Sequence, residues 1–196
     1  MLLMGESING TRKQVAEAIQ ARDAEFIKTL AQDQIDAGAG LLDVNGGVAG
    51  GDEVADLLWL IEIVMGVTDM QLMVDSANPK ALDAGVQAII DKGGKVPFIN
   101  SISGEQPRID AVMPLVEKHK CPVVGLCLSD EGIPPTAEDR FAVAKQIFDL
   151  CTGAGLPARE LTEQLLRQAR LPAGGPFVLI FVALGLTHFE YHHYAR

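Results

Sequence analysis

Basic residues are scarce in this sequence of 196 residues. Only 16 lysines and arginines stand against 26 aspartates and glutamates, which gives a formal net charge of −10. A nucleic-acid binder needs a surface rich in lysine and arginine to meet the phosphates, so this charge balance argues against such a partner. The excess of acid is otherwise an ordinary protein surface and identifies no partner by itself.

Cysteines and long apolar runs are also few. The three cysteines form neither a CxxC pair nor a metal-ligand spacing, and an odd, sparse count is typical of a reducing cytoplasm rather than a disulfide scaffold. The amino terminus lacks the basic region of a signal peptide. The longest apolar run, 177–186, has ten residues, which is too short to span a bilayer. The sequence therefore predicts a cytoplasmic protein with no membrane partner.

What the sequence does contain is an alternation of short apolar runs with longer amphipathic stretches. Runs typical of strands occupy 2–8, 41–45, 71–76, 96–101 and 122–128. Helical patterns occupy 23–38, 52–67, 79–92, 107–119 and 137–153. Asn78-Pro79 and Pro135-Thr136 are typical helix starts, while Gly38 and Gly93 are typical helix ends. Five strand–helix units in series predict an α/β fold with a parallel sheet.

Two architectures fit this alternation, a TIM-type (β/α)8 barrel and an open doubly wound sheet. Polar residues near the ends of the runs favour the barrel, because a barrel brings the carboxyl ends of all its strands to one face. Four of the five runs carry such residues, namely Glu6 with Asn9, Asp43 with Asn45, Asp75, and Asn100. Strand termination by polar residues would also explain them.

The predicted ring contains carboxylates and carboxamides without lysine, arginine or histidine. Such a lining would repel phosphate and suits a neutral heterocycle rich in N–H donors, since a carboxylate accepts two parallel N–H bonds. The glycine-rich stretch GGVAGG (46–51) lacks the ending of a phosphate-binding P-loop. Glycoside hydrolysis by paired carboxylates stays open, because Glu6, Asp43 and Asp75 could approach one another.

Five short motifs occur in order along the chain: GESING (5–10), LDVNGG (42–47), VDSAN (74–78), INSISGE (99–105) and DEGIP (130–134). Together they resemble the pterin-binding, dihydropteroate synthase-like family, and within it the methyltetrahydrofolate:corrinoid methyltransferase branch. The resemblance covers about residues 1–161. Dihydropteroate synthase itself is the enzymatic alternative, but its first two strands lead into N-x-T-P-D-S and G-G-x-S-T-R-P loops, whereas this chain has GESING and DVNGG.

The resemblance implies a methyl transfer between N5 of tetrahydrofolate, the substrate, and the cobalt of a corrinoid (cobalamin) carried on a partner protein. It implies that the pterin is bound by Asp75, Asn100, Asn9, Asp43 and Asn45. It also implies catalytic roles for Glu6 and Asn100 near the reacting end, and no resident metal. Because cobalt is the nucleophile, the protein is expected to supply positioning and electrostatics.

The composition changes near residue 161. No lysine follows Lys145, no aspartate follows Asp149, and three of the four histidines (188, 192 and 193) lie in the last nine residues. We expect an incomplete barrel portion of about five β/α units over 1–161 and an atypical segment over 162–196. That segment is either a frameshifted terminus or a natural tail with a helix at 160–170 and a strand at 177–186. The three histidines are not expected to bind metal, because terminal residues fray.

An incomplete barrel exposes strand edges, which predicts a homodimer or self-association. Because the later strands of the barrel are missing, the alternative to an active enzyme is a non-catalytic pterin-binding fragment.

Overall fold

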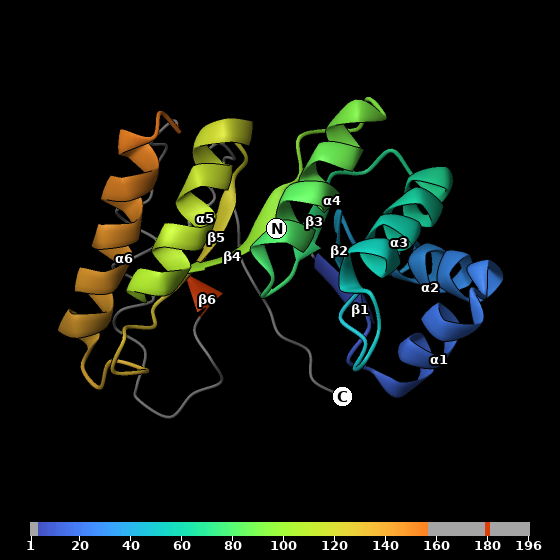
Figure 1. The fold of residues 1–196 in the computed structure, drawn as a ribbon, viewed down its shortest axis with the longest axis horizontal. Helices are drawn as coiled ribbons and strands as arrows, with labels where there is room; N and C mark the ends of the chain where they lie inside the picture. The colour runs from blue at the N-terminus through green and yellow to red at the C-terminus, as the bar shows by residue number, and fades with distance from the viewer. Residues whose placement is uncertain (1–3, 157–178, 181–196) are drawn as a thin grey trace. The chain divides into compact units, whose positions relative to one another are not determined.

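The computed structural model describes residues 4–156 and 179–180 of the chain. Over these residues the chain forms two compact units, of which the first ends at Phe98 and the second begins at Ile99. Strands and helices alternate in both units (Figure 1). The predicted α/β class is therefore confirmed.

The first unit is built on three parallel strands with helices packed against them. The strands are β1 (Met4–Asn9), β2 (Leu41–Asn45) and β3 (Leu72–Asp75). The helices are α1 (Lys13–Ala21), α2 (Ala24–Asp36), α3 (Glu53–Val67) and α4 (Pro79–Asp91). Helices α2, α3 and α4 pack against β1, β2 and β3 respectively and against each other (Figure 1). This packing gives one face of the three strands its helical layer.

The second unit contains two further β/α units. Strand β4 (Phe98–Ser103) precedes α5 (Gln106–His119), and the parallel strand β5 (Val123–Leu126) precedes α6 (Ala137–Gly153). A two-residue strand, β6 (Leu179–Ile180), pairs with β5 in the antiparallel direction. The strand expected at 177–186 is thus present at these two residues, whereas the helix expected at 160–170 and the three carboxyl-terminal histidines lie outside the described residues.

Several helix boundaries follow the signals in the sequence. The Asn78 side chain caps α4 by accepting a hydrogen bond from the Lys80 N–H at 3.0 Å, with Pro79 in the first turn. Thr136 caps α6 by accepting from the Asp139 N–H at 3.1 Å. Helix α1 was not predicted, and its capping residue Arg12 makes no side-chain capping bond. Without a capping signal, this short helix gave no clear start in the sequence.

The direction of the β2 and β3 side chains is fixed by contacts with the helices. A Cβ atom placed on Gly85 of α4 would lie 2.9 Å from Cγ1 of Val74, so Val74 points toward the helical layer. Val44 pairs in register with Val74. Because successive strand residues point to opposite faces, Asn45 and Asp75 point to the face that these helices do not cover.

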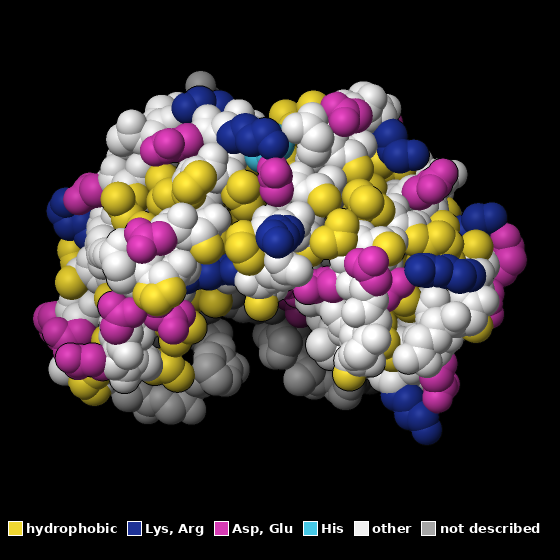
Figure 2. Space-filling view, in the orientation of Figure 1, with side chains coloured by type: hydrophobic (Ala, Val, Ile, Leu, Met, Phe, Trp, Pro, Cys, Tyr) yellow, Lys and Arg dark blue, Asp and Glu magenta, His cyan; other side chains and the backbone are white. Residues whose placement is uncertain are grey.

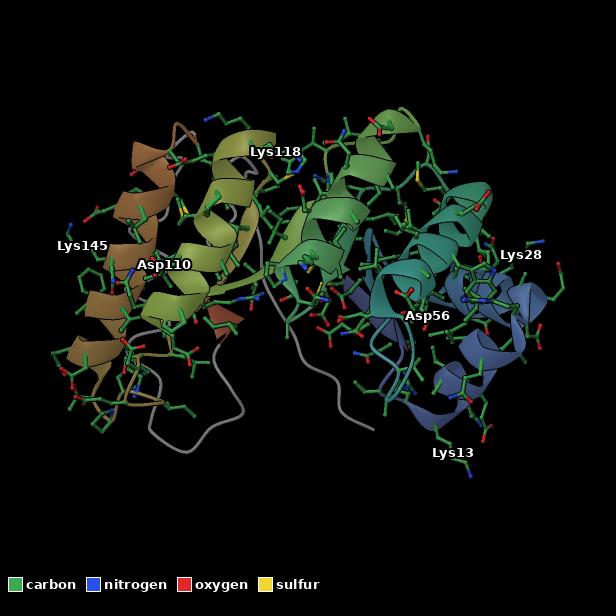
Figure 3. All side chains as sticks on the ribbon, viewed as in Figure 1. Lys13, Lys28, Asp56, Asp110, Lys118 and Lys145 are labelled. Atoms are coloured by element: carbon green, nitrogen blue, oxygen red, sulfur yellow. The ribbon has the colours of Figure 1, made fainter. Side chains whose placement is uncertain are left out.

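The helix surfaces carry charges of both signs. Short ion pairs form within single helices, between Lys28 and Glu25 on α2 and between Lys145 and Asp149 on α6 (Figure 3). On the face drawn in Figure 2, basic and acidic side chains lie among one another. Exposed pairs of this kind contribute only about 0–1 kcal/mol each, so the fold depends mainly on its buried apolar side chains. No helix in the part of the chain that the structure describes combines the length and apolarity needed to cross a bilayer.

All three cysteines are buried, which determines their reactivity. Burial raises the pKa of Cys121 and Cys151 from 9.0 to about 12. Burial also raises the pKa of Cys127 to about 11, although the charge of Arg140 lowers it slightly. At pH 8 the thiols therefore stay protonated, and only the thiolate is nucleophilic. We expect the folded chain to react with Ellman's reagent at least about a hundredfold more slowly than the urea-unfolded chain. Equal rates would contradict this placement of the thiols.

Candidate functional site

The carboxyl ends of the first three strands bring three predicted residues into one line. Asn9 of β1 pairs in register with Asn45 of β2, and the N–H of Gly10 donates to the backbone oxygen of Asn45 at 2.9 Å. The side-chain Nδ2 of Asn45 then donates to Oδ2 of Asp75 on β3 at 2.8 Å. We call Asn9, Asn45 and Asp75 the strand-end row.

The orientation of the Asn45 amide is determined from both sides. Its Oδ1 accepts a hydrogen bond from the N–H of Gly47 at 2.8 Å, while its Nδ2 is bound to Asp75. In the same way, Oδ1 of Asn9 accepts from the N–H of Thr11 at 2.9 Å and from its hydroxyl at 2.7 Å. Short hydrogen bonds to the following loops therefore fix which atoms of the row are donors and which are acceptors.

Asp43 and Glu6 lie deeper along the strands than the strand-end row. Asp43 precedes Asn45 by two residues, so it points to the same face, and it is only 2% exposed. Glu6 is half-buried and lies where β1 departs from regular pairing, in the stretch opposite Asp43. From the sequence we expected all of these acids at the carboxyl ends of their strands. In the structure Asp43 is buried, two residues before the end of β2.

Two residues that the sequence analysis did not select support the end of β3. Ser76 directly follows Asp75, is 2% exposed and donates its hydroxyl hydrogen bond to Oε1 of Glu53, the first residue of α3. The Ser76 hydroxyl oxygen also accepts from the N–H of Asn78 at 2.9 Å. The sequence analysis gave Glu53 no role, and an acid in the first turn of a helix is common in any case.

Asn100 lies on β4, in the second unit. It is half-buried and pairs in register with Val124 of β5, just before an irregularity in that pairing. After the strand, Arg108 Nε donates to the backbone oxygen of Ser101 at 2.8 Å. The Ser103 hydroxyl donates to Oε2 of Glu105 at 2.7 Å, so the short connection between β4 and α5 is held by its own side chains.

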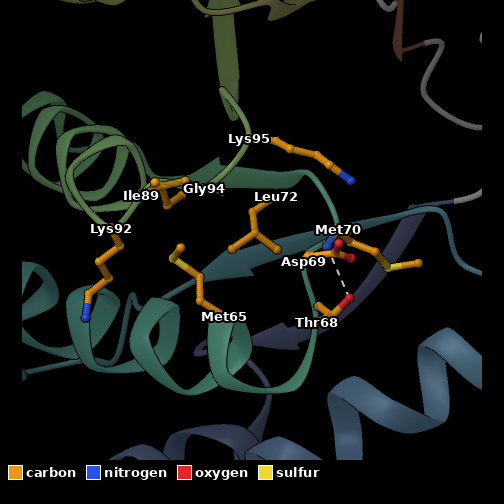
Figure 4. Close-up of a pocket in the computed structure, with 10 residues that line it drawn as sticks. Met65, Thr68, Asp69, Met70, Leu72, Ile89, Lys92, Gly94 and Lys95 are labelled. Atoms are coloured by element: carbon orange, nitrogen blue, oxygen red, sulfur yellow. Dashed lines mark hydrogen bonds between the residues drawn. The ribbon is translucent and has the colours of Figure 1, made fainter.

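A hollow of about 370 Å³ lies at the opposite end of β3 from Asp75 (Figure 4). Its lining includes Leu72, the first residue of the strand, with Met65, Lys92 and Lys95. In β/α barrels the chemistry is placed at the carboxyl ends of the strands, and the amino-terminal face serves stability. We therefore assign the candidate site to the strand-end row rather than to this hollow.

The chemistry available at the strand-end row is binding and orientation. The carboxylate of Asp75 is held by one N–H of Asn45, and a carboxylate offers about four acceptor positions, so it can also accept bonds from a ligand. The row contains no lysine, serine or cysteine nucleophile, and its one ionisable side chain is the Asp75 carboxylate. Acceptor and amide groups arranged in this way suit a neutral ligand with N–H donors.

The chain belongs to the pterin-binding enzyme family, because the model of that family matches residues 5–159. The chain is 32% identical over 151 residues to the methylcorrinoid:tetrahydrofolate methyltransferase of Eubacterium limosum, a match that covers 76% of this chain and 54% of that protein. It is 31% identical over 159 residues to the methionine synthase of Mycobacterium tuberculosis, covering 78% of this chain and 13% of that protein.

Solved structures show the same fold. The dihydropteroate synthase of Stenotrophomonas maltophilia matches with a TM-score of 0.59 at 18% identity, covering 86% of this chain and 66% of that chain. The predicted barrel class is confirmed in incomplete form, as five β/α units. The chain spans about half the length of the E. limosum relative.

Proposed function

We propose that this chain is the folate-binding part of a methyltransferase that moves a methyl group between N5 of tetrahydrofolate and the cobalt of a corrinoid on a partner protein. The observation that supports this most directly is the Asp75 carboxylate, oriented by Asn45 at the carboxyl end of β3. The name of the E. limosum relative supports folate methyl transfer over other uses of a pterin site.

The part assigned to the strand-end row is to hold the pterin in one orientation. Asp75 would accept hydrogen bonds from the amino edge of the ring, while Asn45 holds its carboxylate in place. Asn9, which pairs with Asn45 at the end of β1, would form one side of the proposed pterin site. Fixing the ring fixes the direction in which N5 presents its substituent, and such positioning is a large part of catalysis when the nucleophile comes from a partner.

The remaining proposed roles are those the resemblance implies. N5 of methyltetrahydrofolate is a poor leaving group, so it needs a proton or a strong hydrogen bond as the methyl group departs to the cobalt. In the reverse direction, which the assay below measures, N5 attacks the cobalt-bound methyl group and loses its proton. We assign Glu6 and Asn100 to the reacting end, with Asn100 also bonding the pterin. Asp43 would support the pocket from within the sheet, because it is almost fully buried. The corrinoid supplies the nucleophilic cobalt, and the residues of this chain supply orientation and hydrogen bonding.

A methyl-transfer assay tests this proposal. The purified chain is mixed with tetrahydrofolate and methylcobalamin, and methyltetrahydrofolate is quantified by chromatography. We expect the product to form faster than in the protein-free mixture, and Glu6→Gln and Asn100→Ala to lower the rate without unfolding the chain. A chain that binds tetrahydrofolate and yields no product would instead be a non-catalytic pterin-binding fragment.

A further inference from the structure

We propose that Glu53 is a positioning residue for the pterin site, acting through Ser76 on the carboxylate of Asp75. This inference rests on the proposed function, because one of its two measurements is folate binding. Glu53 is not part of the strand-end row. It is half-buried at the first position of α3, and its nearest link to the site is the hydroxyl of Ser76.

The contact between Glu53 and Ser76 fixes the chain immediately after Asp75. The Ser76 hydroxyl donates to Oε1 of Glu53 and accepts from the N–H of Asn78 at 2.9 Å, and the side chain is 2% exposed. The backbone oxygen of Asn78 is a second possible acceptor but lies farther away, at 3.3 Å, so the charged carboxylate of Glu53 is the preferred acceptor of the Ser76 hydroxyl. The backbone of Asp75 is therefore held from its carboxyl side by a residue of another element.

Glu53 also lies beside the loop that orients Asn45. A Cβ atom placed on Gly47 would be 3.0 Å from Oδ1 of Asn45 and 3.8 Å from Oε1 of Glu53. The N–H of Gly47 is the donor that holds Oδ1 of Asn45. The carboxylate of Glu53 thus binds Ser76 in the loop that follows Asp75 and lies near Gly47 in the loop that follows Asn45.

The same helical turn provides a matched control. Asp56, three residues after Glu53 and labelled in Figure 3, is 6% exposed. It pairs at 2.7 Å with Nη2 of Arg22, whose guanidinium lies 5.0 Å from the ring centroid of Trp59. Arg22 lies between α1 and α2, so this ion pair joins the α1–α2 corner to α3. Asp56 therefore lies one turn along the same helix from Glu53, but its ion pair is with Arg22 and not with the residue that follows Asp75.

Binding of tetrahydrofolate by calorimetry is the first measurement. We expect Glu53→Ala to raise the dissociation constant about tenfold, because the end of β3 loses a hydrogen bond to a charged group. Glu53→Gln keeps an oxygen that accepts from Ser76 and should stay within about threefold of the wild type. Asp56→Ala should lower the melting temperature but leave the dissociation constant unchanged. Equal dissociation constants for Glu53→Ala and Asp56→Ala would overturn the inference.

The side-chain amide signal of Asn45 in a ¹⁵N-correlation spectrum is the second measurement, and it needs no ligand. We expect this signal to shift or broaden in Glu53→Ala and to keep its position in Glu53→Gln and Asp56→Ala. If the wild type does not bind tetrahydrofolate, the proposed function fails. The Asn45 signal then becomes the one test of whether Glu53 positions Asn45 and Asp75. A displaced signal in Glu53→Ala would support that role, and an unmoved signal would overturn it.

Discussion

Replacing Asp75 with asparagine is expected to weaken the binding of tetrahydrofolate by about 1–3 kcal/mol, or roughly 5- to 150-fold in the dissociation constant. The substitution preserves the shape of the side chain and one oxygen that can accept from Asn45 Nδ2. It removes the charge and the second acceptor that a pterin N–H edge requires. The fold should therefore survive while the affinity falls, which calorimetry and a thermal melt can separate.

A matched control for this substitution is Asp52→Asn. Asp52 caps α3 by accepting from the N–H of Ala55 at 3.1 Å, and it is exposed. Asparagine is an equally good capping residue, so neither stability nor affinity should change. If Asp75→Asn binds tetrahydrofolate as tightly as the Asp52→Asn control, the assignment of Asp75 to the pterin is wrong.

Replacing Gly46 with alanine should cause the largest loss of stability. A Cβ atom at this position would lie 2.6 Å from the backbone nitrogen of Leu57 and 2.8 Å from its Cα. These atoms belong to the backbone of α3, which is packed against α2 and α4. The clash therefore requires α3 or the loop after β2 to move. We expect a loss of about 3 kcal/mol and a melting temperature lower by roughly 6–12 °C.

Gly66, in the same helix as Leu57, is the control for Gly46. It is exposed, and a Cβ atom there would meet nothing within 4 Å. Alanine is the better helix former, so Gly66→Ala should stabilise the chain by about 0.5–1 kcal/mol. If Gly46→Ala lowers the free energy of unfolding and Gly66→Ala raises it, the close approach of α3 to the loop at Gly46 is confirmed. A Gly46→Ala variant as stable as the wild type would show that it does not.

Most elements of the fold could be predicted because their signals are local. Strand 41–45 and helix 137–153 have the bounds that the sequence predicted, and Asn78-Pro79 begins α4 as expected. Gly38 and Gly93 follow helices with φ angles of +94° and +73°, which favour glycine. Strand β4 was expected at 96–101 but lies at Phe98–Ser103, because its pairing with β5 continues past Asn100 through Ile102 and Ser103, across an irregularity that periodicity does not reveal.

The candidate site was predictable only in part. Polar residues at the ends of parallel strands indicated that Asn9, Asn45 and Asp75 would be neighbours, and the hydrogen bond from Asn45 to Asp75 joins residues 30 positions apart. The support from Glu53 depends on how α3 packs beside the end of β3, and no local pattern reports that packing. The burial of Asp43 was missed for a related reason, since its position within β2 rather than its residue type decides how exposed it is.

Titration of the chain with tetrahydrofolate in a calorimeter shows whether the strand-end row binds the pterin of a folate. We expect saturable binding with one folate per chain and a clear loss of affinity in Asp75→Asn. This expectation would be contradicted by the absence of binding in a folded wild-type chain, or by binding that Asp75→Asn leaves unchanged.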